Sequence, residues 1–156
     1  MDKIFKKIYI GADSAGFALK EQLSAHLRAQ GFEISDCGTD SEESCHYPTF
    51  AAEVCRAVQA DPASGGILVC GTGIGMSIAA NKHRGIRAAL CGDTFSARMT
   101  RLHNNANVLC LGARVIGFGL AADITDLFVK TGFEGGRHAV RVGMIEDIEG
   151  SEFICK

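Results

Sequence analysis

One stretch of the sequence decides the fold: Ile67-Leu68-Val69-Cys70-Gly71-Thr72-Gly73-Ile74-Gly75-Met76-Ser77. Its apolar first half predicts a buried strand, and its glycine-rich second half predicts a tight turn that opens a helix. Such a turn directs backbone N–H groups at one spot, where they stabilise negative charge and make a thiol easier to ionise. A base and an anion site can coincide there, as the removal of a proton beside a carbonyl requires. Cysteine is also a common core residue, so a purely structural Cys70 remains the alternative.

Similar short apolar runs recur along the chain and predict five strands. They cover residues 7–10, 32–35, 66–70, 88–91 and 108–111. Because their apolar positions are consecutive rather than alternating, we expect strands that are covered on both faces. Residues with helical spacing lie between them, before Gly31 and before Asp61, and further helices are expected over 74–82, 94–103 and 120–130. A last helix is expected to start near Arg137, with Val142, Ile145 and Ile148 on one face.

This alternation predicts a single α/β domain over residues 1–156. We expect a three-layer α/β/α, Rossmann-like arrangement with a five-stranded parallel sheet and a C-terminal helix. Ligands of such folds bind beyond the carboxyl ends of the strands. That rule selects the loops at residues 11–16, 37–48, 70–77, 92–96 and 112–117.

The composition restricts the possible partners. Of the 156 residues, 47% are hydrophobic and the formal net charge is −2, which gives no general attraction to nucleic acid or to acidic membranes. Any anion must therefore be bound by a local cluster of charges. The apolar run near the N-terminus is too short for a signal peptide, and no run is long enough to span a membrane, so we expect no membrane association.

The cysteines indicate a reducing compartment. There are seven, an odd number, and none forms a C-x-x-C pair or stands beside a histidine at metal-ligand spacing. They are Cys37, Cys45, Cys55, Cys70, Cys91, Cys110 and Cys155. We therefore expect a cytoplasmic protein with free thiols, and neither a disulfide framework nor a structural metal site.

Two polar segments stand out as candidate sites. Asp13 and Ser14 follow the first strand, where they serve either chemistry or the N-cap of the next helix. His103 and Asn104 end the fourth helix. A histidine there can exchange protons near neutral pH, or it can simply stabilise the helix end, and the asparagine can equally be a turn residue.

Arginines recur late in the chain. Arg114 follows the fifth strand, and Arg137 and Arg141 are four residues apart with His138 adjacent. That spacing places both guanidinium groups on one helix face, where two forks can hold a phosphate. Paired arginines are also common on solvated helices, so the phosphate site is one of two interpretations.

A nucleotide loop is the competing function. Gly71-x-Gly73-x-Gly75 follows a strand and opens a helix, and Asp93 lies at about the distance expected for a ribose contact. The match is imperfect, because the third glycine comes one residue early and no Lys-Ser/Thr follows. A cofactor-binding module therefore remains the alternative to a cofactor-free enzyme.

Taken together, the motifs resemble the ribose-5-phosphate isomerase B family, which includes the galactose-6-phosphate isomerase subunits. The resemblance runs in the family's order from about Lys7 to Ile148. The motifs are Gly11-x-Asp13, Asp36-x-Gly38-Thr39, Tyr47-Pro48, Cys70-Gly71-Thr72-Gly73-Ile74-Gly75, Ala79-Ala80-Asn81-Lys82, His103-Asn104, Gly112-x-Arg114 and Gly135-Gly136-Arg137-His138-x-x-Arg141.

The resemblance implies a cofactor-free and metal-free aldose–ketose isomerase that interconverts ribose 5-phosphate and ribulose 5-phosphate through a cis-enediolate, in the pentose phosphate pathway of carbohydrate metabolism. By this resemblance Cys70 moves the proton between C2 and C1, His103 donates a proton as the furanose ring opens, and Asp13 assists. The remaining implied substrate contacts are the enediolate-holding turn of Gly71, Thr72, Gly73, Ile74 and Gly75, together with Ser14, Tyr47, Asn104, and a phosphate grip of Arg114, Arg137, His138 and Arg141.

Two positions refine this expectation. One branch of the family uses a glutamate where this chain has Met76, so Cys70 with Met76 resembles the cysteine branch. Many members carry histidine where this chain has Ser14, which leaves allose 6-phosphate or galactose 6-phosphate as alternative substrates. The resemblance further implies a homodimer or a dimer of dimers whose active sites are shared between subunits.

Overall fold

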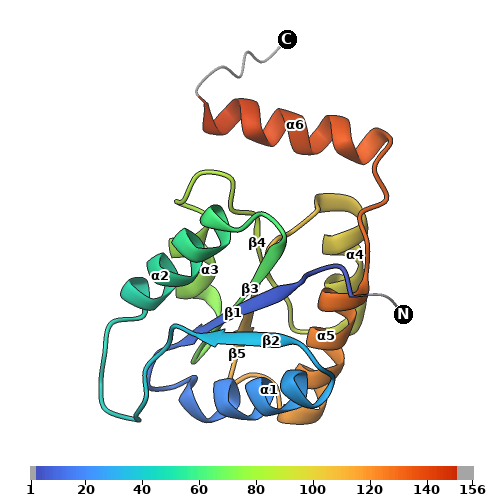
Figure 1. Ribbon diagram of the computed structural model, residues 1–156. Helices are drawn as coiled ribbons and strands as arrows, with labels where there is room; N and C mark the ends of the chain where they lie inside the picture. Colours follow the sequence, from blue (N-terminus) through green and yellow to red (C-terminus); the bar gives the residue numbers. More distant parts are fainter. Residues whose placement is uncertain (1–2, 151–156) are drawn as a thin grey trace.

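Five parallel strands form the sheet on which the chain is built (Figure 1). The computed structural model describes residues 3–150, so Cys155 and the chain ends lie outside the described residues. In the sheet order β2-β1-β3-β5-β4, the strands are β2 (Glu33–Asp36), β1 (Lys7–Ala12), β3 (Ser64–Cys70), β5 (Val108–Gly112) and β4 (Ala88–Leu90). The predicted five-stranded parallel sheet is confirmed, and each strand lies within two residues of its expected bounds.

Six helices accompany the sheet within the described residues. They are α1 (Phe17–Ala29), α2 (Tyr47–Ala60), α3 (Ile74–Ala80), α4 (Thr94–Asn104), α5 (Phe118–Lys130) and α6 (Arg137–Glu149). The helix expected over 74–82 ends at Ala80, because the side chain of Asn81 binds the backbone of Ala88 and ties the chain to β4.

The direction of each crossover explains which helices share a face. The chain moves one way across the sheet through α1 and α4, and the other way through α2 and α3. Right-handed crossovers then require two helices on each face, and α5 joins α1 and α4. The reversal falls between β1 and β3, where the loops that follow these adjacent strands leave in opposite directions. A switch of this kind opens a ligand-binding crevice at the carboxyl edge.

The core lies on both faces of β3, whose seven residues are all buried. One cluster packs Ile67 and Val69 under α1 and α5, and the other packs Leu68 and Cys70 under α2 and α3. The consecutive apolar run in the sequence is therefore that of a strand covered on both sides, as predicted.

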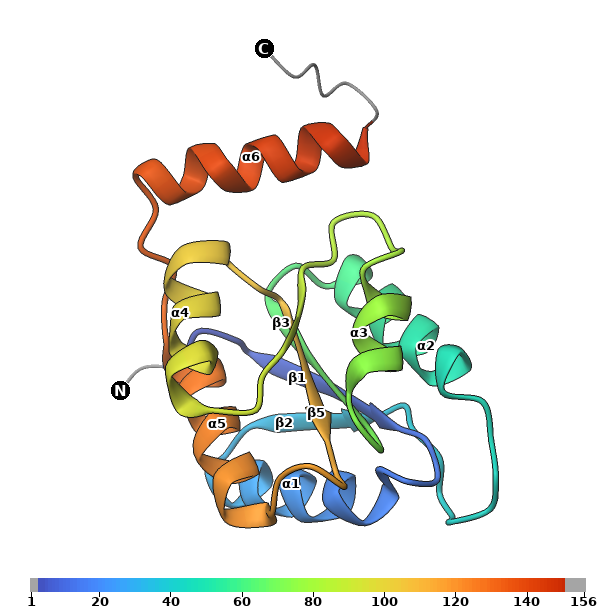
Figure 2. The same cartoon turned by 180° about the vertical axis from the view of Figure 1, so that it is seen from behind.

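Helix α6 lies apart from this body, across one end of the molecule (Figures 1 and 2). Val142 is buried, but Val140 is 67% exposed and Ile148 is 57% exposed. Ile145 and Ile148 line a cavity of about 390 Å³ instead of filling a core. The helix predicted to start near Arg137 is confirmed, and of the three apolar residues expected on one of its faces only Val142 is covered within this chain.

Candidate active site

Asp13 and Cys70 lie next to each other at the carboxyl edge of the sheet. Their strands pair in parallel with Ala12 opposite Val69, and the Asp13 N–H donates to the Val69 carbonyl at 3.3 Å. The half-buried Asp13 accepts a hydrogen bond from the Gly16 N–H at 3.1 Å on Oδ1, which fixes the loop into α1. The N-cap of α1 is Gly16, with no side-chain cap, so the alternative in which Asp13 or Ser14 is the N-cap is wrong. Ser14 is half-buried in the same loop.

The thiol of Cys70 faces the glycine-rich turn. Its Sγ accepts a hydrogen bond from the Gly73 N–H at 3.1 Å, and the residue is 5% exposed. Gly73 has φ +77°, a conformation that side chains disfavour, and a Cβ there would lie 2.9 Å from the Leu111 carbonyl carbon. Glycine therefore suits this turn, which brings a backbone N–H onto the sulfur.

Thr72 and Tyr47 complete the turn. The exposed Thr72 uses Oγ1 to accept a hydrogen bond from the Ile74 N–H at 3.3 Å. Two of the amides expected to hold an enediolate oxygen, those of Gly73 and Ile74, thus bind partners inside the turn. Tyr47, the first residue of α2, lays its ring against Gly75, where a Cβ would lie 2.7 Å from the ring.

Arg114 brings a positive charge to the same edge. It follows β5, and its N–H donates to the Gly71 carbonyl at 3.0 Å. A Cβ on Gly71 would lie 3.5 Å from Arg114 Nη1, so the guanidinium stands directly beside the turn. The side chain is exposed and available to an anion.

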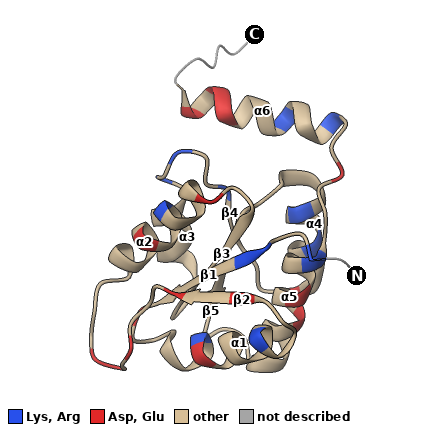
Figure 3. Cartoon of the chain, in the orientation of Figure 1, with Lys and Arg blue, Asp and Glu red and all other residues tan. Residues whose placement is uncertain are grey.

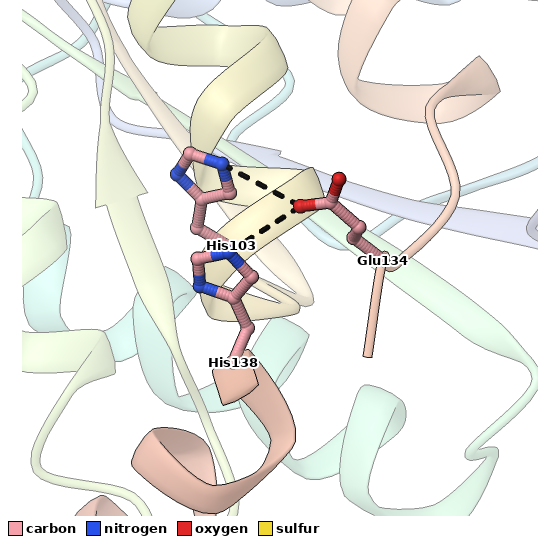
Figure 4. A group of neighbouring side chains, drawn as sticks. All are labelled: His103, Glu134 and His138. Atoms are coloured by element: carbon pink, nitrogen blue, oxygen red, sulfur yellow. Dashed lines mark ion pairs between the residues drawn. The ribbon is translucent and has the colours of Figure 1, made fainter. Parts of the chain in front are cut away.

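A second group of polar side chains gathers around Glu134 (Figure 4). Its Oε2 lies 3.3 Å from His138 Nε2 and 3.8 Å from His103 Nε2, and the two imidazole rings stack with their centroids 4.2 Å apart. His138 is 5% exposed. Burial, followed by the nearby charges of His103 and Arg137, lowers the pKa of His138, which favours its neutral form.

Two of the three arginines expected to bind phosphate, Arg137 and Arg141, lie near the start of α6. Arg137 Nε lies 3.5 Å from His138 Nε2, and both arginines are exposed. Figure 3 shows basic residues toward the start of α6 and acidic residues toward its end. This order opposes the helix dipole, which favours acidic groups at the start. The N-terminus of α6 is therefore strongly positive, as an anion site requires.

The chain does not bring these two groups together. Cys70 pairs with Gly112 at the carboxyl end of β5, whereas His103 and the exposed Asn104 end α4, just before β5 begins. The length of β5 alone, five residues, separates them by about 13 Å. In Figure 2, α6 likewise lies at the opposite end of the sheet from the turn that follows β5. Within one chain, His103, Arg137, His138 and Arg141 do not reach the Cys70 turn.

Glu134 is not among the site residues that the sequence predicts, and two further acidic residues have structural partners. Glu134 stands four residues before His138, and that spacing was the available signal. Asp93 caps α4 by accepting from the Ser96 N–H at 2.7 Å, so the carboxylate that the nucleotide-loop alternative would place on a ribose has a structural partner. Asp36 pairs with the buried Lys20 and accepts from the Gly38 N–H, which gives its motif a structural role.

These features define a class: a parallel α/β protein with a thiol, a carboxylate and a guanidinium at the switch point of its sheet. The family model described as Ribose/Galactose Isomerase matches residues 8–145. The chain belongs to this family.

Relatives and solved structures agree closely with this assignment. A ribose-5-phosphate isomerase B of Escherichia coli (strain K12) is 49% identical over 92% of this chain and 97% of its own length. The structure of Clostridium thermocellum ribose-5-phosphate isomerase B matches with a TM-score of 0.91 at 50% identity, covering 94% of this chain and 99% of that one. A Mycoplasma genitalium ribose-5-phosphate isomerase B with bound ribulose-5-phosphate matches with a TM-score of 0.89 at 40% identity, covering 92% and 96%.

Proposed function

We propose that this protein is an aldose–ketose isomerase that interconverts D-ribose 5-phosphate and D-ribulose 5-phosphate, with Cys70 as the base. The observation that carries the proposal is the hydrogen bond from the Gly73 N–H to Cys70 Sγ, at a turn flanked by Asp13 and Arg114. It supplies a stabilised thiolate where a sugar carbonyl and its neighbouring carbon can be held. The names of the relatives point to the same reaction.

The reaction needs no external redox partner, because one proton and one electron pair move within the sugar. The Cys70 thiolate removes the proton from C2 of the open-chain aldose, and the carbonyl at C1 becomes the enediolate oxygen. The thiol then returns the proton to C1, and the proton of the C2 hydroxyl passes to the oxygen on C1, which yields the ketose and restores the thiolate. His103 donates the proton that the ring oxygen needs on opening, with assistance from Asp13.

We propose further that the working unit is a homodimer, or a dimer of dimers, with active sites shared between subunits. The proposal is supported by the placement of His103 and Cys70 at opposite ends of β5, since a second copy would supply one group to the other. Each end also carries exposed apolar side chains that support an interface. At the Cys70 end they are Ile74, Ile78, Leu90 and Phe95, and on α6 they are Val140, Met144, Ile145 and Ile148.

In this dimer, α6 of one subunit would bring its positive N-terminus to the Cys70 turn of the other. Arg137 and Arg141 would bind the substrate phosphate there, opposite Arg114. The phosphate would then be held at one end of the sugar while the thiol acts at the other. Fixing both ends positions C1 and C2 against the sulfur.

The proposed reaction also suggests a cellular compartment and a pathway. Within residues 3–150, none of the helices combines the length and apolar character that crossing a bilayer requires. The six described cysteines carry free thiols. We propose a cytoplasmic enzyme of the pentose phosphate pathway, since both sugars belong to pentose phosphate chemistry.

The test is a kinetic comparison of ribose 5-phosphate, allose 6-phosphate and galactose 6-phosphate, with neither metal nor nucleotide added. We expect the highest kcat/KM for ribose 5-phosphate. A preference for either six-carbon sugar would replace the proposed substrate and retain the reaction type. A thermal shift with NAD or ATP and none with ribose 5-phosphate would instead favour the nucleotide-binding alternative.

A further inference from the structure

Three separate segments bring ligand atoms to one point beneath α6. His103 comes from the last turn of α4, Glu134 from residues 131–136, and His138 from the first turn of α6. One nitrogen from each ring and one oxygen of Glu134 all lie within 4.8 Å of one another (Figure 4). Two neutral imidazoles and a carboxylate are the ligand set of an open zinc site.

The distances suit a metal ion. Zinc bonds of about 2.0–2.1 Å in tetrahedral geometry place ligand atoms about 3.3 Å apart. The Glu134 oxygen already lies 3.3 Å from His138 Nε2 and 3.8 Å from His103 Nε2. To close the set around an ion, the exposed Glu134 must rotate and the half-exposed His103 must turn its ring out of the stack with His138.

The backbone holds these ligands in place. The Glu134 N–H donates to the Leu102 carbonyl at 3.0 Å, which fastens its segment to α4 beside His103. The His138 N–H donates to the Gly135 carbonyl at 3.0 Å, and its side chain is more than nine-tenths buried. The segment of Glu134 is thus tied to α4 at the residue before His103, and His138 is fixed by burial.

We propose that His103, Glu134 and His138 bind a divalent transition-metal ion of the zinc type, and that this ion inhibits the isomerase. The inhibitory half rests on the proposed function, in which His103 donates a proton. A metal ion on His103 Nε2 occupies the lone pair that would carry this proton, so the ring can no longer act as the acid. The metal ion is therefore a reversible inhibitor of the isomerase.

Binding is measured directly, by calorimetric titration of Zn²⁺ into the full-length protein after treatment with EDTA. We expect one ion per chain. Glu134→Gln keeps the shape of the side chain and removes the charge, and we expect it to weaken binding at least about 10-fold. Glu146→Gln is the matched control, because Glu146 is equally exposed on α6 and pairs with Arg87 instead. Equal affinity of Glu134→Gln and the wild type would overturn the site.

Zinc could instead bind to the Cys70 thiol. A second variant distinguishes this possibility from binding at His103, Glu134 and His138. Cys70→Ser is expected to retain the calorimetric binding, and Co²⁺ in the wild type is expected to show the visible absorption of a low-symmetry site without a thiolate charge-transfer band. Loss of binding in Cys70→Ser, or the appearance of that band, would overturn the proposal.

Inhibition is followed as the wild-type rate against Zn²⁺, with recovery on EDTA. We expect the inhibition curve of Glu134→Gln, measured relative to its own zinc-free rate, to shift by the same factor as its affinity. Zinc binding that leaves the wild-type rate unchanged would overturn the inhibitory role. A protein without isomerase activity would overturn the proposed function alone, since calorimetry still decides the metal site.

Discussion

The backbone N–H of Gly73 points at the sulfur of Cys70 across 3.1 Å, and Gly73 makes this contact in a backbone conformation with φ +77°. The strand places the thiol at the sheet edge, and the turn returns three residues later to supply a donor. The conformation of Gly73 and the chemistry of Cys70 are therefore coupled. A change at Cys70 should remove the proposed base, and a change at Gly73 should distort the turn that holds it. Both should slow the same reaction.

Replacing Cys70 by alanine removes the proposed base while leaving a slightly smaller side chain at the end of β3. We expect kcat to fall about 10²–10⁴-fold, the range typical of a lost general base. The measurement is the rate of ribulose 5-phosphate formation by a variant whose circular dichroism matches the wild type. A folded Cys70→Ala that keeps the wild-type rate would falsify the assignment of the base.

Cys55→Ala is the control for that experiment. Burial raises the pKa of Cys55 to about 12, so its thiol stays protonated at neutral pH. Its sulfur lies in the same apolar cluster as Cys70 and has no role in the proposed reaction. We expect Cys55→Ala to retain nearly full activity.

Gly73→Ala should distort the turn. The new Cβ would lie 2.5 Å from Leu90 Cδ1 and 2.9 Å from the Leu111 carbonyl carbon, in a backbone conformation that costs a side chain about 1–2 kcal/mol. We expect a loss of unfolding free energy of at least that size, measured by urea denaturation, and a large loss of kcat. Gly119→Ala, with open space around the new Cβ and ordinary φ, should change stability by less than about 1 kcal/mol.

The sequence predicts the carboxyl edge of this site well, because local patterns determine it. The apolar run of β3, the glycine turn and the carboxylate after β1 each carry their own signal, and the parallel sheet brings them together. For Glu134 the one local signal is its position four residues before His138, and nothing local links it to His103. Its contact with His103 spans 31 positions and depends on how residues 131–136 cross the end of α4, which spacing along the chain does not encode.

Helix α6 shows the second limit of sequence reasoning. Its apolar spacing predicts Val142, Ile145 and Ile148 on one face, and Ile145 and Ile148 are exposed in the single chain. Apolar spacing shows which residues share a face of the helix. It does not show whether that face is covered by the same chain or by another one. The N-cap of α1 could not be predicted either. Asp13, Ser14 and Gly16 are all favourable turn and cap residues, so the sequence does not show which of them is the cap.

The arginines at the start of α6 should control substrate affinity more than the chemical step. Replacing Arg137 or Arg141 with alanine removes one charge-assisted fork to phosphate, and we expect KM to rise about 10-fold or more with a smaller change in kcat. Steady-state kinetics with ribose 5-phosphate measure both constants. Arg56→Ala, an exposed arginine on α2, serves as the control for net charge. Unchanged KM in both α6 variants would argue against a phosphate grip.

Asp126 predicts how stability depends on pH. Burial alone would raise the pKa of its carboxyl group, but hydrogen bonds from Gln30, His26 and Lys130 outweigh burial and lower it below the ordinary 3.8. A lowered carboxyl pKa adds stability above 3.8, and this stability is lost as pH falls from there through the folded-state pKa.

We therefore expect Asp126→Asn to have a lower unfolding free energy than the wild type at pH 7, and the difference to shrink as acid protonates the wild-type carboxyl. Urea denaturation at several pH values gives the comparison. Asp123→Asn, on the same helix with no comparable network, is the control. A difference that stays constant down to pH values well below 3.8 would contradict the role of the ionised carboxylate.

Mixing two inactive variants tests whether the active site is shared. In the proposed dimer, Cys70→Ala damages one side of each site and His103→Ala damages the other side. A homodimer of either variant then has no intact site, but a mixed dimer has one site with both defects and one with neither. Equal amounts that exchange freely give half mixed dimers, so about one quarter of all sites should be intact and the activity should recover to that level. If both residues acted within one chain, every site in the mixture would keep one defect, and mixing would restore nothing.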